Sequence, residues 1–109
     1  LVLTLYWQAR ADMDRSYTVF THVLDGQNHI WGQLDSLPQG GRLPTTAWLV
    51  GETVEDRYEI VIRPEAPEGE HQIEVGLYEA STGQRLPVLD GTGQRVDDRV
   101  LLGTVKVQR

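Results

Sequence analysis

Acidic side chains are the first residues of this chain whose type and spacing could support catalysis. Two pairs of aspartates lie in polar stretches, Asp12 with Asp14 and Asp97 with Asp98. A general acid and a general base have to lie on opposite sides of a substrate, and residues one or two positions apart in a loop are too close together for that. We therefore interpret both pairs as solvated loop residues.

Metal ligands are the second possibility. Because the chain has no cysteine, His22, His29 and His71 are its candidate transition-metal ligands, and they would meet only if three separate strands converged. The stretch 90–98 has some of the oxygen ligands that Ca²⁺ prefers, but it lacks the Asp-x-Asp-x-Asp run and the final glutamate of a calcium loop. The sequence predicts neither a metal nor another cofactor, and His22 is interpreted as a strand residue with one hydrogen-bonded nitrogen.

Nucleophile and phosphate motifs give no positive signal. Ser16, Ser36 and Ser81 lie outside any Gly-x-Ser-x-Gly context, which is the motif of one large class of serine hydrolases. The two glycines Gly40 and Gly41 could expose backbone N–H groups to a phosphate, but only the neighbouring Arg42 supplies positive charge there. The prediction is a chain that has no catalytic residues and is not itself an enzyme.

Aromatic residues allow a sharper hypothesis. Sugars stack on flat aromatic faces, so Trp31, Trp48 and Tyr58 on one outer surface would form the platform of a carbohydrate-binding module. In the simpler interpretation, Trp7 is a core residue while Trp31 and Trp48 anchor the long loop 36–46 to a sheet. We favour the simpler interpretation and keep the platform as the alternative.

Composition narrows the classes of partner. The chain has 109 residues and a net charge of −6, and no apolar run approaches the roughly 20 residues of a membrane-spanning helix. Nucleic acids and anionic membrane surfaces bind clustered lysine and arginine, so neither is expected as a partner. The length suits a single domain over residues 1–109 that folds without disulfides or metals. The chain starts at Leu1 inside an apolar-alternating segment, which predicts a fragment of a longer protein.

Strands are needed to position these residues, and the clearest one spans residues 71–78. Its apolar side chains alternate with polar ones, so one face is expected in the core and the other is expected to be wet or half-wet. The core face comprises Ile73, Val75 and Leu77, and the opposite face comprises Gln72, Glu74, Gly76 and Tyr78. A turn at 79–83 with Gly83 in a left-handed conformation predicts a hairpin whose second strand returns over 84–89.

Other segments show the same strand pattern. They cover residues 1–9, 17–25, 29–34, 53–62 and 100–107, separated by turns and by the irregular stretch 36–46. The segment 17–25 is apolar on both faces, which predicts a central strand. About seven strands with turn signals every 8 to 12 residues predict an all-β, two-sheet antiparallel β-sandwich of immunoglobulin-like or fibronectin-like plan. A barrel or a jelly roll is the alternative. In a sandwich, the segment 67–71 lies where such folds often have a tyrosine corner, with His71 in place of the tyrosine.

Four segments carry a resemblance to a known type of domain. They read LTLYWQA at 3–9, YTVFTHVLD at 17–25, PQGG and LPTTAWLVGE within 38–52, and PEGEHQIEVGLYEASTGQRLPVLD at 67–90. Together they resemble the soluble β-sandwich domain at the C-terminal end of multi-pass bacterial membrane proteins similar to family 39 glycosyltransferases, the dolichyl-phosphate-mannose protein mannosyltransferase type.

The resemblance implies a location and a role. In that family the chemistry lies in the membrane-embedded part, so no catalytic residue is carried over to this chain. What it implies is a non-catalytic accessory domain on the extracytoplasmic face of a bacterial membrane, held there by the rest of its parent protein. Its expected role is interaction, or the positioning of a glycan or acceptor, with a glycan or a protein as partner.

Overall fold

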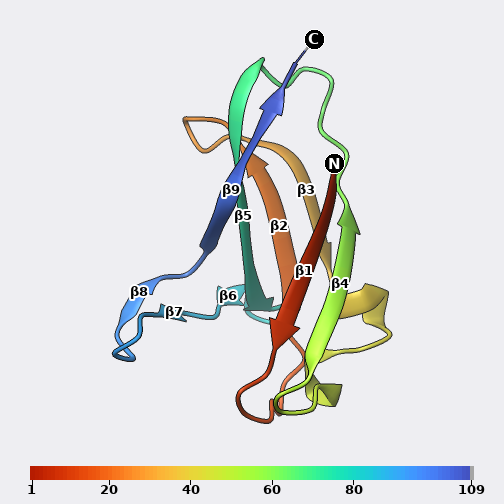
Figure 1. Ribbon diagram of the computed structural model, residues 1–109, viewed down its shortest axis with the longest axis vertical. Helices are drawn as coiled ribbons and strands as arrows, with labels where there is room; N and C mark the ends of the chain where they lie inside the picture. The colour runs from red at the N-terminus through yellow and green to blue at the C-terminus, as the bar shows by residue number, and fades with distance from the viewer. Residues whose placement is uncertain (109) are drawn as a thin grey trace.

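A computed structural model describes residues 1–108 of the protein (Figure 1). Its regular secondary structure consists of β-strands and two short 3₁₀ turns. Six strands are long: β1 (Val2–Gln8), β2 (Thr18–Leu24), β3 (Ile30–Ser36), β4 (Thr53–Glu59), β5 (Gly69–Glu79) and β9 (Val100–Val107). Three are short: β6 (Gln84–Arg85), β7 (Val88–Leu89) and β8 (Arg95–Asp97). Two 3₁₀ turns, η1 (Pro38–Gly41) and η2 (Thr45–Ala47), lie in the long loop between β3 and β4.

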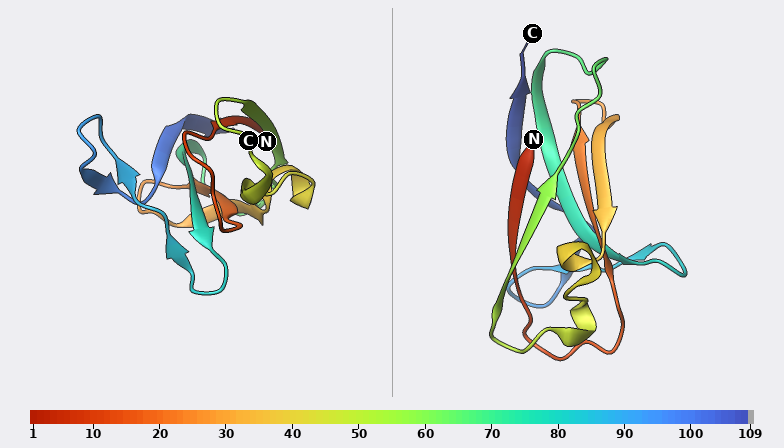
Figure 2. Two further views of the ribbon diagram at one scale, coloured as in Figure 1. Left: turned by 90° about the horizontal axis from the view of Figure 1, so that it is seen from below. Right: turned by 90° about the vertical axis from the view of Figure 1, so that its right-hand side faces the viewer.

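The strands form two main antiparallel sheets that pack face to face (Figure 2). The larger sheet has the order β3-β2-β5-β6, and β9 also pairs with β5. The smaller sheet contains β1 and β4, while β7 and β8 form a separate hairpin. The predicted β-sandwich is confirmed. The described residues contain nine strands rather than about seven, mainly because the expected return strand 84–89 divides and β8 adds a short hairpin partner.

The core lies between the two sheets and follows the predicted alternation. Its buried members are Leu5, Val19, Val23, Tyr58, Ile60, Ile73 and Val75. Each apolar side chain of this size that leaves water contributes about 1.5–3 kcal/mol to folding. β2 is buried along both faces, so the prediction that segment 17–25 is a central strand is confirmed.

Turn residues direct the chain as expected at the β5–β6 hairpin. Gly83 has a φ of 73° and donates its N–H to the carbonyl of Glu79 at 2.7 Å. The N–H of Leu86 still bonds to Leu77, at 2.8 Å, but Pro87 has no N–H to continue the ladder. The chain therefore leaves the larger sheet after β6.

The loop between β3 and β4 is held in place by side chains. Thr45 is fully buried; its hydroxyl donates to the carbonyl of Arg15 at 2.7 Å and accepts the N–H of Tyr17 at 3.1 Å. Trp48 follows η2 and packs on Trp7 of β1 with ring centroids 6.0 Å apart. Trp48 thus anchors the loop to a sheet, as the simpler interpretation expects.

The outward face of β5 differs from the sequence-based prediction. Glu74 was expected on a wet or half-wet face, but only 5 % of its surface is exposed. That prediction is wrong at this position because His22 of β2 and Arg99, just before β9, cover and bind the carboxylate.

Among residues 1–108, no helix is long and apolar enough to cross a bilayer.

Candidate functional site

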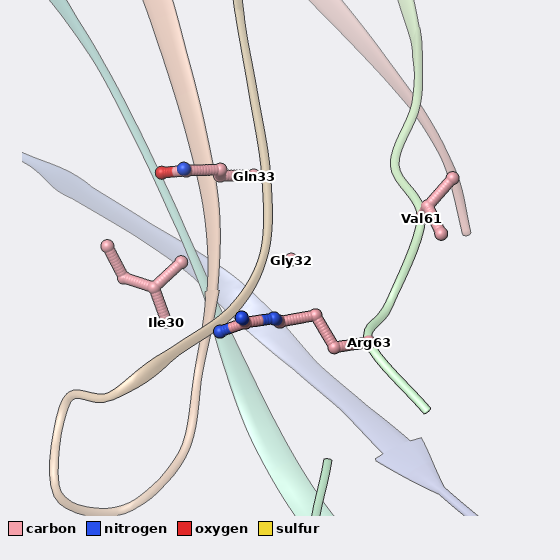
Figure 3. A pocket seen from close by; sticks show the side chains of 5 residues that line it. All are labelled: Ile30, Gly32, Gln33, Val61 and Arg63. Carbon is pink, nitrogen blue, oxygen red and sulfur yellow. The ribbon is translucent and has the colours of Figure 1, made fainter. Parts of the chain in front are cut away.

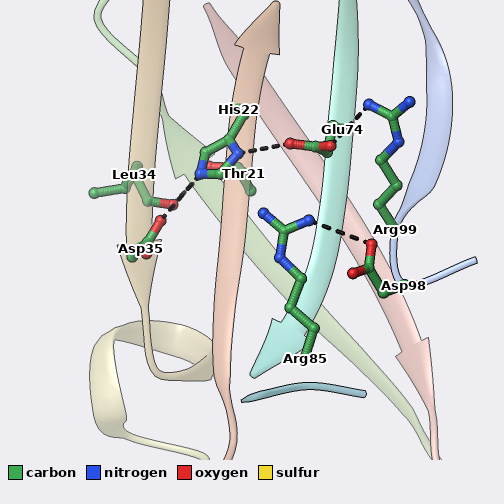
Figure 4. Close-up of polar contacts among 8 residues, drawn as sticks. All are labelled: Thr21, His22, Leu34, Asp35, Glu74, Arg85, Asp98 and Arg99. Carbon is green, nitrogen blue, oxygen red and sulfur yellow. Dashed lines mark hydrogen bonds and ion pairs between the residues drawn. The ribbon is translucent and has the colours of Figure 1, made fainter. Parts of the chain in front are cut away.

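A cluster of charged side chains lies on the outer face of the larger sheet, opposite the core (Figure 4). The outer-face cluster consists of His22, Asp35, Glu74, Tyr78, Arg85, Asp98 and Arg99. Register brings its centre together, because His22 of β2 lies directly opposite Glu74 of β5. Cross-strand neighbours point to the same face, so the two side chains meet although they lie 52 positions apart in the sequence.

Glu74 is the most tightly held member of the cluster. Its Oε2 lies 2.7 Å from Nδ1 of His22, and its Oε1 accepts a hydrogen bond of 2.9 Å from Arg99. Burial by itself raises the pKa of the Glu74 carboxyl, but the hydrogen bonds from His22 and Arg99 and the charges of His22 and Arg85 outweigh it and lower that pKa overall. Both carboxylate oxygens therefore serve to hold the sheet together.

His22 faces carboxylates with both ring nitrogens. While Nδ1 contacts Glu74, Nε2 lies 3.9 Å from Oδ1 of Asp35. The hydroxyl of the adjacent Thr21 donates to the carbonyl of Leu34 at 2.7 Å and is fully buried. The imidazole is thus placed to stabilise negative charge between β3 and β5.

A shallow hollow of about 200 Å³ adjoins the cluster and is lined by Phe20, His22, Asp35, Tyr78, Gly83 and Arg85. The Arg85 guanidinium lies 4.2 Å from the centre of the Phe20 ring, and the Tyr78 hydroxyl donates to Asp35 at 2.9 Å. This hydrogen bond, together with burial and the charge of Asp35, raises the pKa of Tyr78. Enclosed small-molecule sites measure roughly 300–1,000 Å³, so the hollow suits a contact with part of a larger ligand.

The predicted aromatic platform is not formed. Trp48 is 5 % and Tyr58 is 2 % exposed, so neither can offer a ring face to a sugar. Trp48 packs against Trp7 and donates to the carbonyl of Leu43 at 3.0 Å, while Tyr58 lies between the sheets with its hydroxyl on Asp56. The platform prediction is therefore wrong for these two residues.

Trp31 lies apart from the other tryptophans, near the start of β3. Its indole N–H donates to Asp25 at 2.9 Å, and its carbonyl accepts the N–H of Arg63 at 2.8 Å. Hydrogen bonds from Trp31, His29 and Gln27 outweigh burial and hold the pKa of Asp25 far below its usual range. The expectation that Trp31 anchors the long loop is wrong, since its indole instead binds Asp25 in the β2–β3 hairpin and its carbonyl binds the chain after β4.

The histidines and aspartates singled out by sequence do not converge. His29 pairs with Asp25 at 3.2 Å and His71 with the carbonyl of Gly69 at 3.1 Å, while His22 pairs with Glu74. His71 is buried at the start of β5, and its Nε2 has no hydrogen-bond partner. Within residues 1–108, no group of three or more histidine, aspartate or glutamate side chains is arranged to hold a metal ion.

The paired aspartates behave largely as the sequence predicts. Three of them are exposed loop or strand residues: Asp12, Asp14 and Asp97. The fourth, Asp98, is half-buried and lies 3.4 Å from Arg85. Its side chain is 41 % exposed in the loop between β8 and β9, so the solvated-loop interpretation also holds for Asp98, although β6 places Arg85 against it.

A second hollow, of about 410 Å³, opens where the chain after β4 passes β3 (Figure 3). Ile30, Gly32, Gln33, Val61 and Arg63 line it. A Cβ at Gly32 would lie only 3.1 Å from the Ile60 side chain and 3.2 Å from the Val61 carbonyl, so glycine permits the close approach. Arg63 and Gln33 extend separately in Figure 3, and the hollow lacks the convergent charges of the outer-face cluster.

Sequence reasoning missed Glu74, Asp35, Arg85 and Arg99 as members of a cluster. Each occupies a position that alternation assigns to an outer face or a turn, where charged residues are ordinary. Only the strand register, with His22 opposite Glu74, could have revealed the cluster.

Comparison with known proteins gives no relative. No family model, no curated protein and no solved structure matches the chain. The resemblance to the domain of glycosyltransferase-like membrane proteins therefore rests on the sequence segments quoted above.

Proposed function

We propose that this chain is a non-catalytic accessory domain that helps to position a glycan or a glycan acceptor. Its parent, by the sequence resemblance, is a membrane protein similar to family 39 glycosyltransferases, and the domain lies on the extracytoplasmic side. The β-sandwich that the resemblance implies is the fold observed.

The hollow beside the outer-face cluster is the observation that carries the proposal. Asp35 offers a carboxylate that accepts hydrogen bonds from sugar hydroxyls, and Arg85 offers guanidinium N–H donors. Their side chains are 39 % and 33 % exposed, which leaves them accessible to a ligand. Tyr78 adds an aromatic ring, a surface against which the apolar face of a sugar packs.

A role in binding rather than in reaction is supported by how the charges are used. Glu74 has both oxygens bound by His22 and Arg99, and the Tyr78 hydroxyl of the cluster already donates to Asp35. A general acid or base must reach a substrate proton. His22 and Tyr78 instead hold Asp35 in place, while Asp98 and the Phe20 ring hold Arg85.

The test is a titration of the ¹⁵N-labelled domain with soluble oligosaccharides built from mannose, glucose, galactose or N-acetylglucosamine. We expect at least one of them to shift the amide signals of Tyr78, Gly83 and Arg85, with a Kd of about 1 mM, which corresponds to about −4 kcal/mol. Asp35→Asn should weaken binding because it replaces a charged acceptor by a neutral amide, and Tyr78→Phe should weaken it because it removes the phenol hydroxyl from the hollow.

The matched control is Arg57→Gln. Arg57 is an exposed arginine of β4 that pairs with Glu59, on the other sheet. The substitution Arg57→Gln changes the net charge without altering the hollow, so the sugar-induced shifts should be the same as in the wild type. Saturating concentrations of every oligosaccharide without shifts around Tyr78 and Arg85 would contradict the proposal.

A further inference from the structure

The smaller sheet has an open edge along β1. Leu1 and Ile60 exchange both backbone hydrogen bonds, at 3.0 and 2.8 Å, and this fixes the alternation along the strand. Odd-numbered residues of β1 direct their N–H and C=O groups to β4. The residues that direct them outward, away from any strand, are Val2, Thr4, Tyr6 and Gln8.

An apolar groove borders this edge. β9 runs beside β1 in both views of Figure 2 but pairs only with β5. Between them lies a groove of about 320 Å³, which is lined by Thr4, Leu5, Tyr6 and Trp7 of β1, Val75 of β5, and Val100 and Leu102 of β9. The register between β5 and β9 skips Leu102, and a bulge of this kind redirects a side chain.

Natural edge strands are protected against pairing by charges, prolines or covering loops. The outer edge of β4 has such a cover, because the Gln39 side chain of η1 donates to the carbonyl of Glu55 at 2.8 Å. β1 has none of these devices: no charged side chain or proline occurs from Leu1 to Ala9, and Tyr6 is 66 % exposed. The edge keeps the features that favour strand pairing.

We propose that this groove accepts an extended segment of a partner polypeptide as an additional β-strand. We take the added strand to pair antiparallel to β1, as the strands of this protein pair with one another. Because β1 and β9 run in opposite directions (Figure 1), such a strand runs parallel to β9. Such strand addition draws affinity from main-chain hydrogen bonds and specificity from alternate side chains. The partner segment is uncharged, about seven residues long to match β1, and has an apolar side chain at every second position.

The side-chain pattern of the partner follows from the register. Residues that hydrogen-bond to Thr4 and Tyr6 share their outward side-chain face, so polar residues such as threonine suit these positions. The alternate residues point into the groove beside Leu5 and Leu102, where valine or isoleucine fits. A folded second copy would bring a neighbouring strand with it, and β9 already lies on that side of β1 (Figure 2).

The probe is a capped peptide, Thr-Val-Thr-Val-Thr-Val-Thr, followed by two lysines for solubility. Amide hydrogen exchange is measured by NMR with and without it. We expect saturating peptide to slow exchange at Thr4 and Tyr6 at least tenfold, while Leu3 and Leu5, already paired with β4, change little. The same peptide N-methylated at its threonines should have no effect, because those N–H groups are the ones that pair with β1.

Two pairs of variants locate the binding. Tyr6→Pro removes an outward N–H without removing a backbone bond to β4 and should abolish protection. Tyr6→Thr loses the same side-chain hydrogen bond to Glu55 but keeps the outward N–H, so it should keep the protection. Leu102→Lys places a charge in the groove and should weaken binding at least tenfold. Leu101→Lys, at the position opposite Glu74, adds the same charge to the same strand outside the groove and should bind normally.

Three outcomes would overturn the proposal. They are an absence of protection at millimolar peptide, equal binding of the N-methylated peptide, and a concentration-dependent dimer in sedimentation that slows exchange at Thr4 and Tyr6 by itself. The last would assign the edge to a second copy of the chain. Because the groove and the outer-face hollow share no lining residue, the sugar titration can fail or succeed independently.

Discussion

Two buried carboxylates in this protein are held in opposite ways. Glu74, on the outer face of the larger sheet, binds the side chains of His22 and Arg99. Asp56 of β4 faces the long loop and accepts hydrogen bonds from three neutral donors: the Tyr58 hydroxyl at 2.5 Å, the Trp7 indole at 3.2 Å and the backbone N–H of Gln39 at 2.8 Å. Positive charge thus surrounds Glu74, whereas Asp56 is bound by neutral hydrogen-bond donors.

The difference shows what each carboxylate does for the fold. Asp56 joins β1, β4 and η1, so it ties the long loop to the smaller sheet. Burial, the hydrogen bond to Asp56 and the charges of Asp56 and Asp35 together raise the pKa of Tyr58 far above its usual range, which keeps the phenol protonated as a donor. Glu74 instead joins three segments of the larger sheet and fixes the groups beside the hollow. The effects of changing the two carboxylates should therefore separate.

The largest effect is expected for Asp56→Ala. Three buried or half-buried donors lose their acceptor, and unpaired groups of this kind cost about 1–3 kcal/mol each before the structure relaxes. We expect a loss of about 3–4 kcal/mol in the free energy of unfolding, measured by urea titration with tryptophan fluorescence. Trp7 should also become more accessible to acrylamide. A loss below about 1 kcal/mol would mean that Asp56 does not tie the loop to the sheet.

Glu74→Gln should cost less, about 2 kcal/mol. The amide keeps one acceptor and nearly the same shape, but it leaves His22 and Arg99 without their counter-charge. Urea unfolding measures the loss, and the sugar titration reports whether Asp35 and Arg85 remain in place. If Glu74→Gln were more destabilising than Asp56→Ala, the ranking of the two sites would be reversed.

Acidification should act on the Glu74 site specifically. Because the pKa of Glu74 is lowered in the folded protein, its contribution to stability is present above the ordinary value of 4.5 and is lost as the pH falls through the lowered folded value. The stability difference between wild type and Glu74→Gln should therefore shrink as the pH falls below about 4.5. A difference that stays constant to pH 2 would show that the pKa of Glu74 is not what links its charge to folding.

The smallest effect is expected for Tyr58→Phe, about 1 kcal/mol. This change removes one neutral donor from Asp56 and leaves Trp7 and Gln39 in place, while the ring still fills the core. Urea unfolding checks it against Asp56→Ala. Equal losses for the two variants would mean that Tyr58 alone satisfies Asp56.

The strands were predictable because their signal is local. The alternation of Ile73, Val75 and Leu77 identifies β5 and its core face, and the two-sided apolar pattern of 17–25 identifies β2 as central. Gly83 marks the hairpin because a left-handed residue is needed there. Asp56 was not predicted as buried, although it lies between Val54 and Tyr58 on the inward face of β4.

The candidate site was not predictable from the same signal. Glu74 and Trp48 occupy positions that sequence alone allows on a surface, and both are buried. Their burial depends on residues far away in the chain, His22 and Arg99 for Glu74 and Trp7 for Trp48. Because contacts between residues far apart in the chain cannot be read from the local pattern, the aromatic platform was predicted wrongly and the hollow at Asp35 and Arg85 was missed.

By itself, the sequence of this protein determined the strands, their inward faces and most turns, because a period of two and the conformations of glycine and proline act over a few residues. Tertiary structure alone decided which strands are neighbours. It thereby paired His22 with Glu74, buried Asp56 under the loop, and left β1 with an unpaired edge beside β9. These outcomes depend on long-range packing of whole sheets, which no local pattern of residues encodes.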